Sequence, residues 1–226
     1  MRWPWTKEKE YPEFWEKYSS AFAKAKSERK KKTSASLVSN TRFVVLDTET
    51  TGLDVKNDRI LSIGAVSLKG RIIEVSNSLE FYLKQDKYNP ESAPIHGILK
   101  NGNYEKVNEV EAIKACLDFI GTDILVGHHI GFDIAIINNT LKRHGVGKLK
   151  NKVLDTSILY KRMLHPVNYA LVRQIYTLDE LSESLKIPMY DRHTAAGDAM
   201  ITSLAFIKIM SRINSDGLMK VKSLFQ

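Results

Sequence analysis

The stretch "RFVVLDTETTGLD" at residues 42–54 decides the fold of this chain. After its first residue come four apolar ones, a run typical of a buried strand. Asp47 and Glu49 follow, one residue apart. Side chains at positions i and i+2 of a strand point to the same side of the sheet. The two carboxylates are therefore predicted to project together from the end of a buried strand.

Two carboxylates placed so close together need a cation. Like charges repel, and burying them without a partner is costly. No lysine or arginine stands nearby in the sequence, so a divalent metal ion is the natural candidate. The "TTGLD" that follows contains Gly52, whose missing side chain lets the backbone come close to a ligand.

The chain from this strand to about residue 213 reads as an α/β domain. Residues 59–70 and 71–84 predict a hairpin, and a polar loop follows at 84–104. Helices are predicted at 108–121, 132–145, 177–186 and 194–213, and short strands in 123–129 and at the start of 153–164, which continues as a helix. Three neighbouring strands followed by alternating helices and strands imply a mixed β-sheet flanked by α-helices.

Three further places repeat the acidic theme of the first strand. Asp133 stands at the start of a helix directly after a strand, and Asp155 stands at another strand end. His193 and Asp198 lie five residues apart at the start of the last long helix. Asp198 is surrounded by small and apolar residues, where a bare carboxylate is costly without a partner. Taken singly each has a structural explanation such as a helix cap, but together they indicate a site.

The segments "DTETTGLD", "GHHIGFDIAII" and "RHTAAGDA" resemble the three motifs of the DEDDh family of 3′–5′ exonucleases, which includes the proofreading epsilon subunit of bacterial DNA polymerase III. "PESAPIHGI" is similar to that family's loop between the first and second motifs. The resemblance covers about residues 42–212, with the segments in the family's order. It implies a ribonuclease H-like fold.

The resemblance implies a complete catalytic set. Asp47, Glu49, Asp133 and Asp198 match the family's metal-ligand carboxylates, and His193 matches its general base. Two Mg²⁺ or Mn²⁺ ions would clamp the scissile phosphate, and hard oxygen ligands suit these ions better than Zn²⁺. Imidazole titrates close to neutral pH and can take a proton from water. The expected product is a 5′-mononucleotide released from a 3′ end.

Substrate contacts are implied by the same resemblance. The expected contact residues are Thr50, Thr51, Leu53, Glu91, His96, Ile98, Phe132 and His129. Phe132 is also explained as a core residue. His129 stands where the family usually has Asn, and a zinc site formed with its neighbour His128 is not expected without a nearby Cys or third His. Asp155 matches a common family Asp and is interpreted as structural.

The sequence divides into three parts: 1–40, an aromatic and basic helical extension with a linker; 41–215, the exonuclease domain; and 216–226, a C-terminal tail. Phe14, Trp15, Tyr18 and Phe22 recur at helical spacing in the first part. This aromatic face either packs on the main domain or docks to a partner protein or nucleic acid. The tail "KVKSLFQ" is faintly similar to sliding-clamp binding peptides.

The chain has a net charge of +8, which suggests a polyanionic partner. Residues 1–40 hold ten basic and five acidic side chains, so +5 of that charge lies there. The dense basic run at 142–152 is either a solvated helix end or a phosphate-tracking surface. The lone Cys116 favours a reducing, cytoplasmic setting. No apolar run is long enough for a membrane span, and no signal peptide is expected.

The expected function is a metal-dependent 3′–5′ exonuclease acting on DNA, in proofreading or repair. DNA is preferred because the motifs are more similar to those of proofreading subunits than to those of small-RNA exonucleases. An RNA exonuclease of the same fold and a non-catalytic nucleic-acid-binding or docking subunit are the alternatives. A polymerase domain does not fit in this length, so proofreading would need a polymerase partner.

Overall fold

A computed structural model describes residues 11–31, 36–100, 102–172 and 174–226 of the chain. Its α-helices are α1 (Glu13–Lys31), α2 (Ala93–His96), α3 (Glu109–Ile120), α4 (Gly131–Arg143), α5 (Thr156–Leu164), α6 (Leu178–Leu185) and α7 (Ala195–Ile213). Its strands are β1 (Arg42–Thr50), β2 (Ile60–Lys69), β3 (Ile72–Leu83), β4 (Lys106–Val107), β5 (Ile124–Gly127) and β6 (Val153–Asp155). Short 3₁₀ helices lie at Val38–Asn40, Tyr169–Leu171 and Val221–Phe225.

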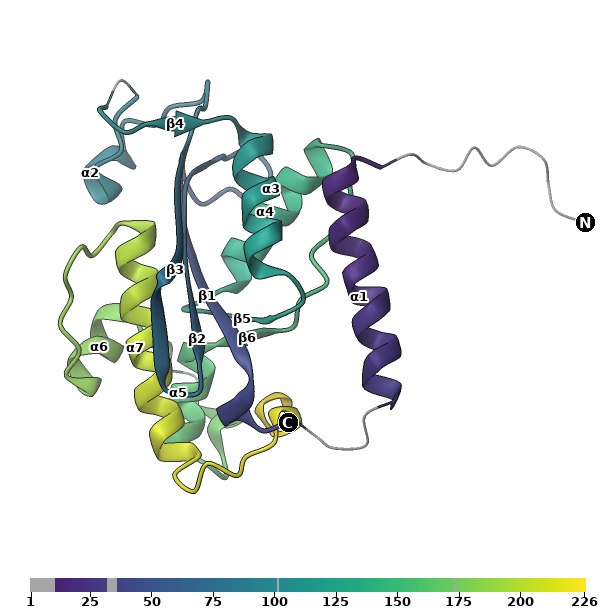
Figure 1. Ribbon diagram of the computed structural model, residues 1–226. Coiled ribbons are helices and arrows are strands. Elements are labelled where there is room, and N and C mark those ends of the chain that lie inside the picture. Colours follow the sequence, from purple (N-terminus) through teal and green to yellow (C-terminus); the bar gives the residue numbers. More distant parts are fainter. Residues whose placement is uncertain (1–10, 32–35, 101, 173) are drawn as a thin grey trace, which may run out of the picture.

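The strands form one mixed sheet in the order β4-β3-β2-β1-β5-β6 (Figure 1). The β1–β2 and β2–β3 pairs are antiparallel, whereas β5 and β6 extend the sheet in parallel with β1. The hairpin turns where expected, with Lys69 opposite Ile72. This arrangement confirms the predicted ribonuclease H-like α/β fold. The two-residue strand β4 follows the expected polar loop at 84–104 and is too short to leave a pattern in the sequence.

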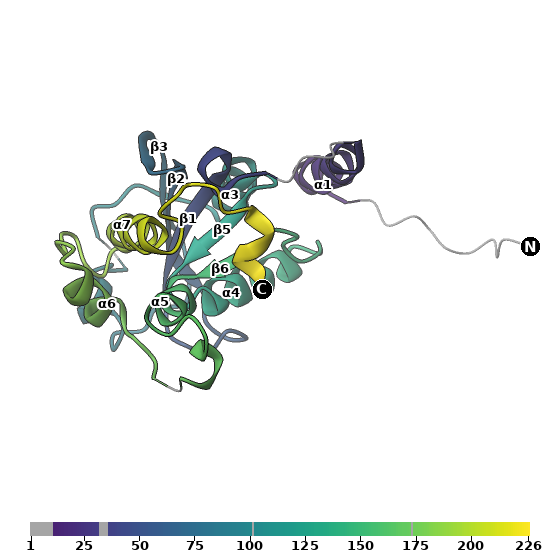
Figure 2. The ribbon, with the colours of Figure 1, turned by 90° about the horizontal axis from the view of Figure 1, so that it is seen from below.

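Alternate residues of β1 feed two separate hydrophobic clusters. Phe43 and Val45 pack with α5, α6 and α7 on one face of the sheet. Val44 and Leu46 pack with α3 and α4 on the other face. Figure 2 shows the sheet between these two helical layers. A strand buried on both faces must be apolar at every position, which explains the unbroken apolar run of the sequence.

Helix α1 lies outside α3 and α4, as Figures 1 and 2 show. Trp15 and Tyr18 are each only 4% exposed and belong to the same cluster as α3 and α4. The Tyr18 hydroxyl donates to Asn151 Oδ1 and accepts from the Lys150 backbone N–H, both at 2.7 Å. The aromatic face of α1 is therefore covered by the main domain, as the packing alternative required.

The C-terminal segment is also folded onto the domain. Leu224 is buried in the α7-side cluster, and the Lys152 ammonium lies 4.6 Å from the ring centre of Phe225. The Met219 carbonyl accepts from the Val38 N–H, so the segment pairs with the chain just before β1. The similarity of this tail to clamp-binding peptides stays a prediction. No helix among the described residues is long and apolar enough to cross a bilayer.

Candidate active site

Strand β1 carries Asp47 and Glu49 to the face of the sheet covered by α7. Both share the alternation of Phe43 and Val45, whose side chains pack on that face. The strand emerges from the core at this point, because Asp47 and Glu49 are only half-buried whereas residues 43–46 are buried. The predicted pair of carboxylates thus lies where the apolar run of β1 ends.

Gly64 brings the start of α7 onto this pair. It lies opposite Asp47 in the β1–β2 register. A Cβ atom at Gly64 would come within 2.2 Å of the backbone carbonyl carbon of Ala195, the first residue of α7. Glycine is therefore required for the helix to approach the sheet this closely. The approach places Asp198, in the first turn of α7, beside the β1 carboxylates.

Asp47, Glu49 and Asp198 form a compact acidic cluster. One carboxylate oxygen from each lies within 4.8 Å of the others. Burial raises the pKa of Glu49 to about 8, and repulsion by Asp198 adds to the rise. Burial also raises the pKa of Asp47 and of Asp198, and for Asp47 the neighbouring carboxylates act in the same direction. The three groups thus resist ionising together in the absence of a cation.

Asp133 approaches the cluster from α4 and lies outside the 4.8 Å group. Its Oδ1 accepts two hydrogen bonds from Thr48, one from the backbone N–H at 3.0 Å and one from the hydroxyl at 2.7 Å. Thr48 lies between Asp47 and Glu49 and points to the opposite face of β1. Burial raises the pKa of Asp133 to about 7. Repulsion by Asp133 in turn raises the pKa of Asp47, which places the two carboxylates near each other.

The turn before α7 carries His193 at the edge of the cluster. His193 is exposed, and its φ of 66° lies in the left-handed region that a non-glycine residue seldom adopts. A Cβ atom at Gly197 would come within 2.0 Å of the Asp191 carbonyl oxygen, so this turn folds tightly onto α7. The backbone N–H of His193 donates to Asp198 Oδ1 at 3.3 Å. Strained residues held by such packing are characteristic of functional sites.

Arg192 is a cation at the site that sequence reasoning missed. Its guanidinium donates to Asp198 Oδ2 and, at 2.7 Å, to Asp179 Oδ1 of α6. One of its nitrogens lies 3.2 Å from His193 Nδ1. Its charge lowers the pKa of Asp198 and so offsets part of the effect of burial. Its position directly before His193 was a signal, but only the fold shows that it reaches α6.

Of the expected substrate contacts in the turn after β1, one is exposed and two are buried. Leu53 is 85% exposed and offers a free apolar surface. Thr50 is buried, and its hydroxyl donates to the Gly52 carbonyl at 2.7 Å. Thr51 is fully buried, and its hydroxyl donates to Asp58 Oδ1 at 2.7 Å. The two threonine side chains therefore shape the turn, whereas Leu53 is available to a ligand.

The loop that contains α2 presents one unused hydrogen-bond donor. The Nδ1 atom of the buried His96 accepts from the Ile98 backbone N–H at 3.0 Å. In the neutral ring Nε2 then carries the proton, and Nε2 has no partner among the described residues. Burial lowers the pKa of His96, which favours that neutral ring. Ile98 is buried beside it, and Glu91 is exposed.

His128, His129 and Phe132 contribute mainly to the framework. Both imidazole Nε2 atoms lie within 3.0 Å of the Tyr176 carbonyl oxygen, so both act as donors. Burial lowers the pKa of His128 to about 4. Phe132 packs against the α3–α4 cluster. Asp155 caps α5 and also accepts from the His129 N–H, which fits its structural interpretation.

The donor set of the acidic cluster fits a hard divalent cation. Three carboxylates supply only oxygen atoms, which Mg²⁺ and Mn²⁺ prefer. Within the described residues, this is the only group of at least three His, Cys, Asp or Glu side chains close enough to hold a metal ion. A divalent cation would also relieve the repulsion that raises the pKa values of these groups. The cluster is therefore suited to holding a divalent cation.

The family model of the RNase T exonuclease matches residues 44–206, and the chain belongs to this family. The fold and site thus define an exonuclease of the ribonuclease H-like class, a phosphodiester hydrolase. The epsilon subunit of DNA polymerase III from Aquifex aeolicus is 30% identical over 172 residues, which cover 76% of this chain and 81% of that protein. By family membership, the chain carries an exonuclease domain.

Two other comparisons extend this result. The PolC-type DNA polymerase III of Lacticaseibacillus paracasei is 31% identical over 169 residues, which cover 73% of this chain. The chain spans only 11% of that protein's length. Among solved structures, Escherichia coli exonuclease I in complex with a dA16 oligonucleotide superposes with a TM-score of 0.67 at 18% identity. That match covers 79% of this chain and 42% of the other, and it shows a shared fold.

Proposed function

We propose that this protein removes 5′-mononucleotides from the 3′ end of DNA by hydrolysis that depends on two Mg²⁺ or Mn²⁺ ions. The observation that carries the proposal is the acidic cluster, in which Asp47, Glu49 and Asp198 converge from β1 and α7. Asp133 completes the set from α4. Loss of a carboxylate or of His193 would have favoured a non-catalytic binding subunit, but all five residues are present.

The four carboxylates of Asp47, Glu49, Asp133 and Asp198 would hold the metal ions. When bound, the ions polarise the scissile phosphate and stabilise the attacking and leaving oxygens. Thr48 keeps Asp133 Oδ1 occupied by two hydrogen bonds, so Oδ2 is the oxygen left for a ligand. Arg192 would have to leave Asp198 Oδ2 when an ion takes that oxygen, and it could then contact the substrate phosphate.

His193 would act as the general base that takes a proton from the attacking water. Its exposed position on the turn before α7 lets the imidazole approach a phosphate bound at the cluster. The tight packing of that turn against Gly197 limits the backbone positions open to His193. Restricting a base in this way favours proton transfer in a productive geometry.

The terminal nucleotide would lie between the turn after β1 and the α2 loop. Leu53 would pack on its base, and the unpaired Nε2–H of His96 would donate to a sugar or phosphate oxygen. Leaving a buried donor without a partner costs about 1–3 kcal/mol, which a substrate oxygen would recover. The binding site of this terminal nucleotide would be shaped by Thr50, Thr51, Ile98 and Glu91.

DNA is the proposed substrate, and a polymerase the proposed partner in proofreading. The epsilon and PolC-type relatives, both named for DNA polymerase III, support this assignment. An RNA exonuclease of the same fold is the second candidate. A cytoplasmic setting fits replication enzymes, and the single Cys116 is buried and free.

The test uses purified full-length protein with 3′-labelled single-stranded DNA, duplex DNA and RNA of one sequence. We expect release of 5′-mononucleotides with Mg²⁺ or Mn²⁺, none with EDTA, and the fastest release from DNA. His193→Ala and Asp198→Ala should lose activity, whereas His165→Ala, an exposed histidine at the end of α5, should retain it. Undiminished cleavage by Asp198→Ala, or release of internal fragments, would overturn the mechanism.

A further inference from the structure

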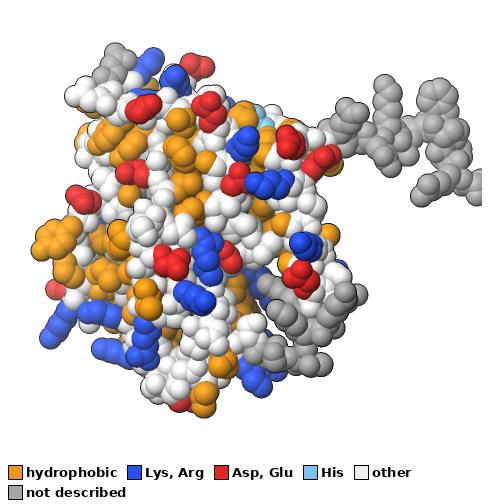
Figure 3. Space-filling view, in the orientation of Figure 1, with side chains coloured by type: hydrophobic (Ala, Val, Ile, Leu, Met, Phe, Trp, Pro, Cys, Tyr) orange, Lys and Arg blue, Asp and Glu red, His pale blue; other side chains and the backbone are white. Residues whose placement is uncertain are grey.

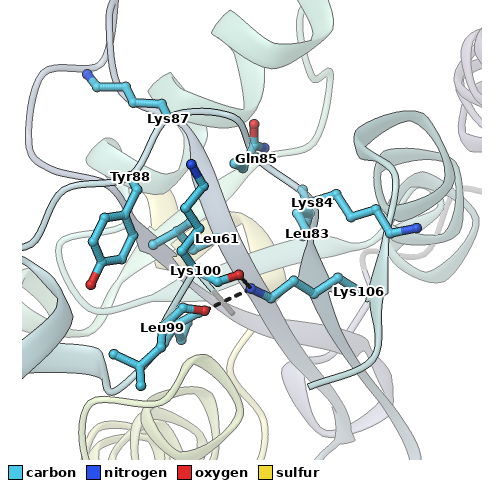
Figure 4. A pocket seen from close by; sticks show the side chains of 10 residues that line it. Leu61, Leu83, Lys84, Gln85, Lys87, Tyr88, Leu99, Lys100 and Lys106 are labelled. Atoms are coloured by element: carbon cyan, nitrogen blue, oxygen red, sulfur yellow. Dashed lines mark hydrogen bonds between the residues drawn. The ribbon is translucent and has the colours of Figure 1, made fainter. Parts of the chain in front are cut away.

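A pocket of about 170 Å³ opens where β2 begins and β3 ends, next to the loop that follows α2 (Figure 4). Leu61, Leu83 and Ile98, all nearly fully buried, form its apolar floor, and the exposed Leu99 also lines it. Tyr88, which is 36% exposed, forms part of its wall. An apolar floor beside an exposed aromatic ring is suited to a flat, partly apolar ligand.

Lysines surround this pocket without an acidic residue in its lining. Lys87 is paired with Asp58 at 2.7 Å, and Lys106 donates to the backbone carbonyls of Leu99 and Lys100. The ammonium groups of Lys84 and Lys100 have no hydrogen bond or ion pair with any part of the chain that the structure describes. The rim therefore offers at least two free positive charges.

The concentration of positive charge is local to this pocket. On the face shown in Figure 3, basic and acidic side chains are intermixed and do not form a continuous basic band. The basic run at 142–152 is partly neutralised, because Arg143 pairs with Glu109 at 2.6 Å. Lys150 is held by a hydrogen bond to Ser19 Oγ. The pocket is thus a local feature and does not belong to a general cationic surface.

The pocket adjoins the active site through shared elements. Leu61 precedes Ser62, which lies opposite Glu49 in the β1–β2 register. Tyr88 precedes Asn89, whose side-chain amide donates to the Thr51 carbonyl at 2.9 Å. Ile98 lines the pocket and belongs to the loop proposed to face the terminal nucleotide. A nucleic-acid strand whose 3′ end is held at the acidic cluster would therefore pass close to Lys84 and Lys100 at the rim of the pocket.

We propose that this pocket binds a nucleotide of the substrate strand upstream of the terminal one. Its base would pack on Tyr88 and the apolar floor, and its phosphates would contact Lys84 and Lys100. Proteins that hold single strands combine aromatic stacking with cationic contacts to the backbone. The inference rests on the proposed function, and it makes an unpaired segment behind the 3′ end part of the recognised substrate.

The test compares the double variant Lys84→Ala/Lys100→Ala with the double variant Lys69→Ala/Lys114→Ala. The control removes the same charge from exposed positions at the end of β2 and on α3. For a twelve-nucleotide single strand, the pocket variant should show a KM and a dissociation constant about tenfold higher, with kcat unchanged. Its log–log salt slope should weaken by about 1.4, because each phosphate contact on single strands contributes about 0.7. Tyr88→Ala should weaken binding about fivefold.

Two readouts keep the inference separate from the proposed function. The p-nitrophenyl ester of a mononucleotide is too short to reach the pocket, so the pocket variant should hydrolyse it at the wild-type rate. Binding of the same twelve-nucleotide strand, labelled with a fluorophore, is measured by anisotropy in EDTA and needs no catalysis. Absence of hydrolysis by the wild type would count against the proposed function. Equal dissociation constants for the pocket and control variants would overturn the pocket assignment.

Discussion

Two polar regions of this protein treat their buried groups in opposite ways. At the end of β1, Asp47 and Glu49 crowd against Asp198, and their pKa values rise because no internal cation fully compensates them. Where α1 meets the domain, the Tyr18 hydroxyl both donates to and accepts from residues 150–151. In the first region the carboxylates still require a cation, which a bound ligand can supply. In the second region the hydroxyl has all its hydrogen-bond partners within the chain. Function should therefore depend on the first region and stability on the second.

Asp47→Asn should produce the largest effect. The amide keeps the shape of the side chain and removes the charge that a metal ion needs, so the rate of mononucleotide release should fall by about 10³-fold or more. Stability in EDTA at pH 8 should stay the same or rise, because one source of repulsion is lost. Initial rates and thermal unfolding measure the two effects. Glu183→Gln, at an exposed position on α6, should change neither, and an active Asp47→Asn enzyme would refute the comparison.

Trp15→Ala tests the other region. Trp15 is 4% exposed and lies in the interface between α1 and the main domain. Removing its ring should lower the free energy of unfolding by about 3 kcal/mol. Denaturant titration measures this change, and kcat at a temperature where the variant is folded should remain that of the wild type. Ile72→Ala, on a residue 70% exposed, is the control and should cost little. A loss of activity in folded Trp15→Ala protein would show that α1 takes part in the site.

The pH dependence of stability follows from the raised pKa values. Folded Glu49, with a pKa of about 8, binds its proton more tightly than the unfolded chain does. In EDTA this contribution to stability is complete below about pH 4.5 and is lost as the pH rises through 8. The melting temperature should therefore fall between pH 6 and 8.5, and Mn²⁺ should reverse the fall.

Glu49→Gln provides the matched control for that pH profile. The amide cannot titrate, so the slope of melting temperature against pH in EDTA should become shallower. Asp58 and Glu109 do not interfere, because their pKa values are lowered and they act at more acidic pH. A melting temperature that rises steadily from pH 6 to 8.5 in EDTA would contradict the proposed electrostatics.

Thr48→Val should have the smallest effect. It removes the 2.7 Å hydrogen bond from the Thr48 hydroxyl to Asp133 Oδ1 and leaves the backbone bond in place. The loss of one such bond to a charged group is worth about 1.5 kcal/mol, so kcat/KM should fall roughly tenfold. Thr48→Ser, which keeps the hydroxyl, should lie near the wild type. Equal rates for the valine and serine variants would mean that Thr48 does not position Asp133.

The first strand and its carboxylates could be predicted because their signals are local. An apolar run, the i and i+2 spacing of Asp47 and Glu49, and the capping box at Thr177 each lie within a few residues. The ordered motifs then supplied Asp133, Asp198 and His193 through resemblance. These residues gather at one end of the sheet because the fold places strand ends and helix starts there.

Other features depend on contacts between distant segments and could not be predicted in the same way. Gly64 looks like a weak point in a strand, and only the approach of α7 explains it. Arg192 reaches Asp179 on another helix, and Thr51 turns inward to Asp58. The amphipathic pattern of α1 predicted an apolar face, but the surface that covers it is set by tertiary packing.

Calorimetric titration with Mn²⁺ at pH 7, in two buffers of different ionisation enthalpy, tests the central claim most directly. If the acidic cluster needs a cation, wild-type protein should bind Mn²⁺ and release protons, because Glu49 with a pKa of about 8 must ionise. Asp198→Asn should bind at least tenfold more weakly. Equal Mn²⁺ affinity in the two proteins, or binding without proton release, would contradict the assignment of this cluster as the metal centre.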